Sequence, residues 1–272
     1  MSHRKEAARE WARSVIRNHI PRTARRFSLA VYVGEASVNA ALGMQFDLHP
    51  VEGKVVELSG EWILVKIGRG PDFFVVARDL VDQVPDLGAM VRVTPYARRG
   101  FDGRRLDAVR ETTVATGCVT QAFVLGETKS ALPLDHDAIR SSHLRTMVEY
   151  IESLEAGDGV RCLSQVLVDA GAYLEPVVAV DPADQDVLVT PPSLKFRIRT
   201  AAHDGWLEYR YDRAMDAFDM RLTDAGGNVA KQAEDVYFDD ISRITVEWVD
   251  DGIWRVAKIE ILKPAPRRAA AA

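Results

Sequence analysis

The sequence predicts an α+β protein that combines a small antiparallel β-barrel of the OB or SH3 type, a helical hairpin and a C-terminal antiparallel sheet. Three observations predict this class. Short β-branched runs alternate with Gly, Pro and Asp over residues 51–110, apolar residues recur at helical spacing over 137–155, and apolar and basic residues alternate over 194–199. The length of 272 residues suffices for two modest domains.

The N-terminal segment up to residue 20 predicts a helix, in which Trp11, Val15 and Ile16 form an apolar stripe with Ala8 and Ala12 alongside. Eight of the first 26 residues are Lys or Arg, and only two are acidic. This excess predicts an arm that contacts phosphate groups. Two alternatives remain open: a solvated helix docked through Trp11, and a helix that lies on a membrane surface.

Four apolar runs supply the strands of the predicted barrel, namely Lys54–Leu58, Glu61–Ile67, Phe73–Ala77 and Met90–Tyr96. Turn residues separate them, with Ser59-Gly60 after the first run and Gly68-Arg-Gly70 after the second. Because no crossover helix fits between strands this close in sequence, they must pair antiparallel and close or curl to cover their edges.

The segment 137–155 is the clearest helix in the sequence, with Asp135 or Asp137 in position to cap it. A second helix follows and ends at Gly171, so residues 137–171 predict a helical hairpin. Further along, Leu194, Phe196 and Ile198 alternate with three basic residues, which predicts a strand with one solvated face.

Asp251-Gly252 predicts a two-residue β-hairpin near the C-terminus, because a type I′ turn requires positive φ at both central positions. The domain organisation that follows from these elements is consecutive. It comprises a basic helix or arm (1–26), the β-barrel domain (27–132), the helical hairpin with a linker (133–190), the antiparallel sheet domain (191–264) and a disordered tail (265–272).

Charge is distributed unevenly along the chain. Residues 1–134 carry 19 Lys and Arg against 15 Asp and Glu, whereas residues 135–263 carry 14 against 25. A basic front half suggests a polyanionic ligand, and an acidic back half suggests a basic partner or solubility. No apolar run is long enough to span a membrane, and the N-terminus lacks the apolar core of a signal peptide, so we expect a cytoplasmic protein.

The loop from Arg98 to Arg105 is the most distinctive feature, because it combines four arginines, two glycines and one aromatic ring. Guanidinium groups match phosphate geometry, and an aromatic ring offers a face on which a base can stack. An exposed hairpin kept soluble by its charges is the alternative. The predicted nucleic-acid-binding residues are Arg98, Arg99, Phe101, Arg104, Arg105, Arg22, Arg25, Arg26 and Trp62.

Evidence for catalysis is weak, since the chain has no nucleophile elbow and no phosphate-binding Gly-Lys-Ser/Thr loop. Cys118 and Cys162 lack metal-ligand spacing and predict buried free thiols, and we expect no cofactor. Four carboxylates form the candidate surface for a protein partner, and as a third alternative they would hold a divalent cation in a metal-dependent enzyme. They are Glu234, Asp235, Asp239 and Asp240.

Residues 51–110 resemble the small β-domain of the KfrB family of plasmid and mobile-element accessory proteins. The resemblance lies in Gly53-Lys-Val-Val-Glu, Val65-Lys-Ile-Gly-Arg-Gly70 and Phe74-Val-Val76, although Ala77-Arg78 stand where the family has a histidine. It implies an accessory protein that binds DNA or partner proteins. The expected function is therefore non-catalytic nucleic-acid binding for a mobile element. The alternative is an interaction scaffold or an inhibitor, such as an anti-defence protein, that acts through the acidic half.

Overall fold

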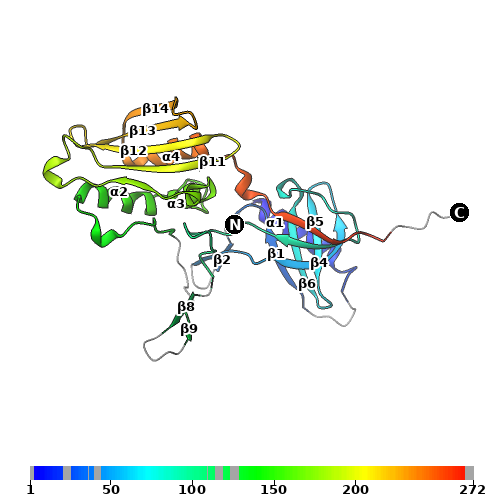
Figure 1. Cartoon of the computed structure of the whole chain (residues 1–272). Helices are drawn as coiled ribbons and strands as arrows, with labels where there is room; N and C mark the ends of the chain where they lie inside the picture. Colours follow the sequence, from blue (N-terminus) through cyan, green and yellow to red (C-terminus); the bar gives the residue numbers. More distant parts are fainter. Residues whose placement is uncertain are drawn as a thin grey trace. The chain divides into compact units, whose positions relative to one another are not determined.

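The computed structural model describes residues 3–20, 26–35, 37–39, 44–108, 110–113, 119–122 and 129–266. The chain divides into two compact units, and each is discontinuous in sequence (Figure 1). The first unit comprises Met1–Ser37, Asp47–Ala97 and Trp254–Ala272, and the second comprises Val38–Phe46 and Arg98–Ile253. The sequence predicts consecutive domains, whereas the observed units interleave along the chain.

A six-stranded sheet forms the centre of the first unit. In spatial order its strands are β1 (Ser28–Tyr32), β6 (Asp72–Ala77), β5 (Trp62–Ile67), β4 (Val51–Leu58), β7 (Met90–Thr94) and β15 (Lys258–Lys263). β1 runs parallel to β6, and the other neighbouring pairs are antiparallel. The sheet ends in two edge strands and does not close, so the α+β class is confirmed but the small barrel is not.

The neighbouring strands β5 and β6 are buried on both faces, which explains why their sequences are almost continuously apolar. On one face, Leu64 and Phe73 lie in a core with the helix α1 (His3–Ile16). The helix contributes Ala8, Ala12 and Ile16, which are spaced four apart and fully buried. The predicted N-terminal helix is confirmed, and Trp11 and Val15 of its predicted stripe are only partly buried.

The residues on the two sides of Asp251-Gly252 do not form the predicted β-hairpin. The residues before it form the helix α4 (Phe238–Val249), in which Ile241, Thr245 and Trp248 are buried at helical spacing. The residues after it lead to β15, which pairs with β7, so that Ile259 lies opposite Val93 in the first unit. The hairpin prediction is wrong because the local turn signal is weaker than two tertiary interactions. These are the pairing of β15 with β7, which is distant in sequence, and the packing of the apolar face of α4.

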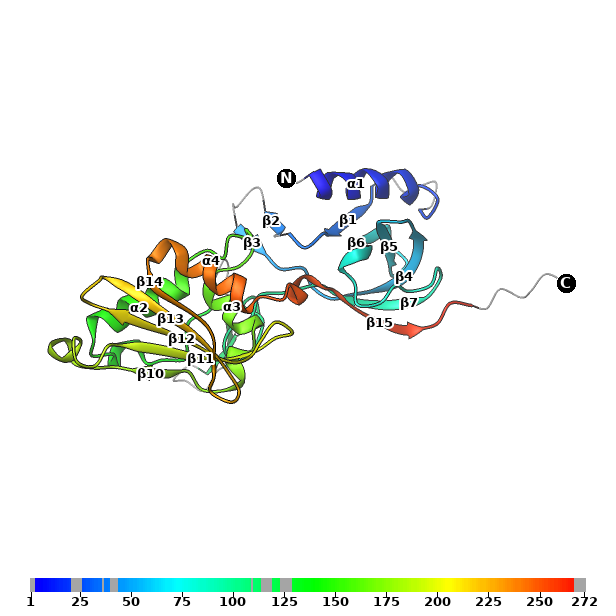
Figure 2. The ribbon, with the colours of Figure 1, turned by 90° about the horizontal axis from the view of Figure 1, so that it is seen from above.

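The second unit contains a five-stranded antiparallel sheet. Its strands lie in chain order: β10 (Val178–Val180), β11 (Ser193–Arg199), β12 (Asp204–Asp212), β13 (Ala217–Asp224) and β14 (Val229–Val236). One face of this sheet shares a core with the helices α2 (Ser142–Ser153), α3 (Leu163–Asp169) and α4 (Figure 2). The predicted C-terminal antiparallel sheet is confirmed for residues 193–236, whereas residues 238–249 form α4 and β15 belongs to the first sheet. The helices supply the core that this sheet needs.

The predicted helical hairpin corresponds to α2 and α3, but its first helix starts later than expected. The side chain of Ser141 caps α2, where its oxygen accepts a hydrogen bond from the N–H of Leu144 at 3.3 Å. Asp135 instead caps the short 3₁₀ turn η2 (His136–Ala138) through the N–H of Asp137. The residue that caps α2 is therefore Ser141, next to the apolar stripe, and not the predicted Asp135 or Asp137.

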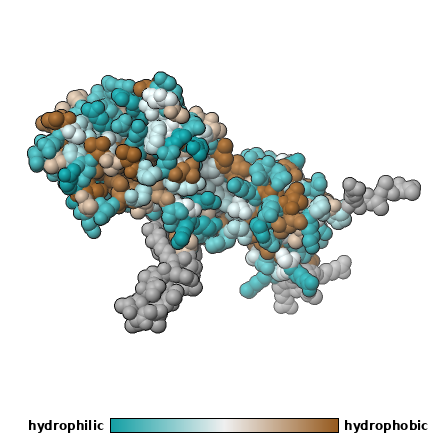
Figure 3. All heavy atoms as spheres, in the orientation of Figure 1, coloured by the Kyte–Doolittle hydropathy of each residue, from teal (hydrophilic) through white to brown (hydrophobic). Residues whose placement is uncertain are grey.

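Short elements complete the description. They are the strand pairs β2 (Ser37–Asn39) with β3 (Met44–Phe46) and β8 (Arg110–Thr113) with β9 (Val119–Ala122), and the 3₁₀ turns η1 (Arg78–Leu80), η3 (Ala172–Leu174), η4 (Asp184–Asp186) and η5 (Ile253–Arg255). Apolar residues on the faces visible in Figure 3 occur in separate groups between hydrophilic ones. Within the described ranges, no helix has the length and apolar character needed to cross a bilayer.

Candidate nucleic-acid interface

The arginine loop, which we define as residues 98–105, folds as a tight hairpin in the second unit. Arg99 and Arg105 form an antiparallel bridge, and the N–H of Gly100 donates to the carbonyl of Arg104 at 3.0 Å. Gly103 adopts a φ of 73° at the tip, a conformation that favours glycine. The carboxylate of Asp102 accepts a hydrogen bond from the N–H of Arg104 at 2.9 Å and fixes the turn.

A cavity of about 540 Å³ opens beside this loop. Its lining includes the basic residues Arg104, Arg105 and Lys129, together with Phe101 and the acidic residue Asp102. Arg104 and Lys129 are exposed, and neither forms an ion pair with any described residue. The cavity therefore offers two uncompensated cations to an anionic ligand.

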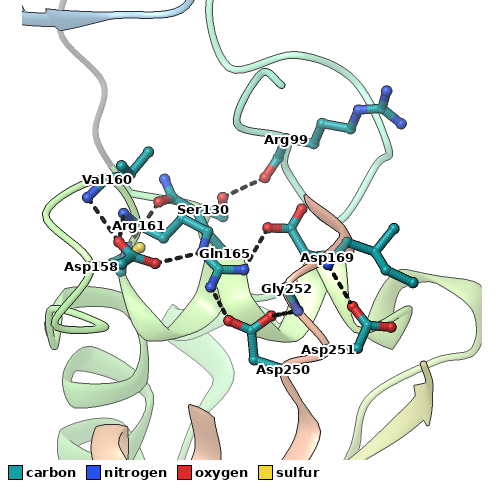
Figure 4. Close-up of polar contacts among 12 residues, drawn as sticks. Arg99, Ser130, Asp158, Val160, Arg161, Gln165, Asp169, Asp250, Asp251 and Gly252 are labelled. Atoms are coloured by element: carbon teal, nitrogen blue, oxygen red, sulfur yellow. Dashed lines mark hydrogen bonds and ion pairs between the residues drawn. The ribbon is translucent and has the colours of Figure 1, made fainter. Parts of the chain in front are cut away.

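The four loop arginines differ in their surroundings. Arg98 is only 4% exposed, and the guanidinium of Arg105 binds the carboxylate of Asp107 through two contacts of 2.7 Å. The backbone carbonyl of Arg99 accepts a hydrogen bond from the hydroxyl of Ser130 at 2.6 Å, and its exposed side chain points away from that contact (Figure 4). Arg99 and Arg104 are therefore the loop arginines that an external ligand reaches most easily.

The two aromatic residues proposed for base stacking are less accessible than expected. Phe101 packs against the core of the second unit, and its ring centroid lies 6.4 Å from that of Phe196. Trp62 is 6% exposed within the core beneath α1, and the guanidinium of Arg4 lies 5.9 Å from its ring centroid. Phe101 still lines the cavity. The burial of Trp62 argues against its stacking on a nucleic-acid base.

The predicted basic arm is described only in part. Arg26 is exposed, whereas Arg22 and Arg25 lie outside the described residues, as does Cys118. The second cysteine, Cys162, is buried and unbridged, as predicted. Arg13 on α1 and Arg17 directly after it are exposed, and Arg4 on α1 is paired with Asp79.

A buried arginine that the sequence analysis did not identify lies close to the loop in Figure 4. The side chain of Arg161 is 1% exposed and pairs with Asp158 at 2.8 Å, Asp169 at 3.0 Å and Asp250 at 2.5 Å. Burial alone would lower the pKa of this guanidinium, but the carboxylates, Asp169 foremost, raise it above the usual value. No motif indicates this cluster, because Asp250 lies 89 positions from Arg161 in sequence.

The four carboxylates of the predicted partner surface lie at the junction of β14 and α4. Glu234 and Asp235 belong to the edge strand β14, and Asp239 and Asp240 to the first turn of α4. The guanidinium of Arg243 pairs with Asp240 at 2.6 Å. In the part of the chain that the structure covers, no group of three or more His, Cys, Asp or Glu residues is arranged to hold a metal ion.

No family model, no curated protein and no solved structure matches the chain. The resemblance of residues 51–110 to the KfrB family therefore stays a prediction.

Proposed function

We propose that the protein binds nucleic acid and that the cavity beside the arginine loop receives part of the phosphate backbone. The observation that carries this proposal is the pair of exposed, uncompensated cations Arg104 and Lys129 at the rim of a cavity of about 540 Å³. Both cations lie within residues 1–134, the part of the chain in which Lys and Arg outnumber Asp and Glu, so the charge distribution of the sequence agrees with a positive site here.

The geometry of the loop supports the same proposal. Gly100 lines the cavity and Gly103 stands at the tip of the hairpin, so a ligand can approach the backbone closely. Arg99 adds a third accessible cation, on the same hairpin as Arg104. The binding role requires no catalytic group, and an accessory function on a plasmid or another mobile element stays a prediction that rests on the KfrB resemblance.

The test measures the affinity of the full chain for fluorescent DNA and RNA oligonucleotides as a function of salt concentration. We expect Arg104→Ala combined with Lys129→Ala to weaken binding and to lower the slope of log K against log salt by about 1.4 for a single strand, because each phosphate contact contributes about 0.7. The matched control removes two exposed charges that do not line the cavity, Arg213→Ala with Lys258→Ala. Equal slopes in all three proteins, or no binding at low salt, would exclude the proposed site.

One observation favours a second candidate function, the capture of a basic protein partner. Tyr237 is 59% exposed and stands between Asp235 and Asp239, both of which are exposed. Tyrosine is enriched in protein interfaces, and the carboxylates would select a positively charged partner. Affinity capture with the wild type and with a variant carrying Asp235→Lys and Asp239→Lys tests this candidate. A specific partner that is retained equally by both proteins would show that the acidic surface is not involved.

A further inference from the structure

The five-stranded sheet of the second unit has a second face, opposite the helices. Along β11, Leu194, Phe196 and Ile198 are fully buried in the helix-covered core, whereas the side chains between them point the other way. This second face carries charged and polar side chains that are mostly exposed or half-buried: Lys195, Arg197, Arg199, Trp206, Glu208, Arg210, Asp219, Arg221 and Thr223. The face is therefore solvated and mixed in charge.

A single tryptophan marks the middle strand of this face. Trp206 lies on β12, opposite Arg197 on β11 and Thr223 on β13. The ammonium group of Lys195 lies 5.2 Å from the ring centroid of Trp206, and the guanidinium carbon of Arg197 lies 5.9 Å from it. Trp206 is half-buried and does not belong to the helix-covered core.

The cations around Trp206 differ in whether the protein compensates them. Arg197 is buried and pairs with Glu175 and Asp204, so its charge is balanced internally. Lys195 and Arg221 form no ion pair within the described part of the chain. They flank Glu208 on the two neighbouring strands, which leaves an excess of positive charge beside the tryptophan.

We infer that this group, the Trp206 patch (Lys195, Trp206, Glu208 and Arg221), is a binding surface for single-stranded nucleic acid. The inference rests on the proposed function and adds the form of the ligand and a second contact surface. Phosphate groups complement the uncompensated cations, and an unpaired base stacks on the indole. A duplex satisfies only the first of these contacts, because its bases are stacked and paired within the helix.

The charge pattern of the patch also predicts an opposing effect. The carboxylate of Glu208 stands between the two cations and repels a phosphate that approaches them. The variant Glu208→Gln should therefore bind a single strand more tightly than the wild type. An acidic peptide would respond in the same way but would gain nothing from stacking, so replacement of Trp206 separates the two ligands.

The experiment measures binding of the full chain to a single strand of about 12 nucleotides, to the duplex of the same sequence and to polyglutamate. We expect Trp206→Ala to weaken single-strand binding about tenfold, with little effect on the duplex, and Trp206→Phe to retain most of the affinity. The charge variant Lys195→Ala with Arg221→Ala should lower the salt slope for the single strand by about 1.4. Indole fluorescence quenched by the single strand should be quenched less in Trp206→Phe.

Three outcomes would overturn the inference. If single strands bind but neither the tryptophan variants nor the charge variant changes the affinity, the patch is not a contact surface, and the proposed function stands through the arginine loop alone. If polyglutamate competes as well as the single strand and Trp206→Ala has no effect, the surface binds anions in general. If no nucleic acid binds, the proposed function fails as well. Should Trp206→Ala unfold, Trp206→Phe and the charge variant still decide the question.

Discussion

The guanidinium of Arg161 donates a hydrogen bond to the carboxylate of Asp250 at 2.5 Å, although 89 positions separate the two residues in sequence. Arg161 precedes Cys162, the N-cap residue of α3, and Asp250 is the C-terminal cap of α4. The contact therefore ties two helices of the second unit together from within. Because the arginine is 1% exposed, its charge depends entirely on groups of the protein itself.

We expect Arg161→Met to lower the free energy of unfolding by about 3–5 kcal/mol, because it leaves the buried carboxylates without their cation. Chemical denaturation of the full chain provides the measurement. The control is Arg243→Ala, which removes an exposed ion pair with Asp240 and should change stability by about 1 kcal/mol or less. Similar losses in the two variants would mean that the buried cluster adds no more than a surface pair.

Close packing of α1 on the first sheet leads to a second prediction. Ala12 has no exposed surface, so Ala12→Leu should force larger atoms into a filled core and destabilise the first unit by about 1–3 kcal/mol. The neighbouring variant Arg13→Leu places the same side chain at an exposed position and should change stability by about 0.5 kcal/mol or less. Thermal melting of both proteins makes the comparison, and equal melting temperatures would contradict the tight helix-sheet contact.

The elements that the sequence analysis identified share strong local signals. The strands β4 to β7 are short β-branched runs between turn residues, and α2 carries apolar residues on one face at helical spacing. The order of the strands within the sheets could not be predicted from the sequence. Neither the parallel pairing of β1 with β6 nor the pairing of β15 with β7 has a local signal, because both join segments that are distant in sequence.

The candidate site was also predictable from the sequence only in part. The arginine loop was recognisable from its composition, but burial of Arg98 and the pairing of Arg105 with Asp107 depend on tertiary contacts. Trp206 carries no sequence signal of its own. Its position beside Lys195 follows only from the register of β11 and β12, and a shift of one residue would have buried it.

The close approach of β12 and β13 explains why a glycine occupies position 205. A Cβ atom at Gly205 would collide with the backbone carbonyl of Thr223 on the neighbouring strand. We therefore expect Gly205→Ala to destabilise the protein strongly, since backbone atoms on both strands would have to move. Gly60→Ala is the control, because a Cβ there meets nothing within 4 Å and its φ is not positive. Equal stability of the two variants in denaturant titrations would contradict this account.

The hydrogen bonds between Asp181 and the residues before α2 should make the stability of the second unit depend on pH. Its two carboxylate oxygens accept hydrogen bonds of 2.9 Å from the N–H groups of Arg140 and Ser141, directly before α2. Burial by itself raises the pKa of Asp181, but these N–H groups and the charge of Arg140 lower it overall. The folded protein therefore holds the charged form more strongly than the unfolded chain does.

A lowered pKa in the folded state fixes the sign of the effect. The stabilisation from Asp181 is fully present above the pKa of an unfolded aspartate, about 3.9, and it is lost as the pH falls through the lower pKa of the folded state. We expect the wild type to lose more unfolding free energy than Asp181→Asn as the pH falls from neutral to acid. Denaturant titrations of both proteins across this range provide the measurement, and parallel pH profiles would show that the carboxylate contributes no pH-dependent stability.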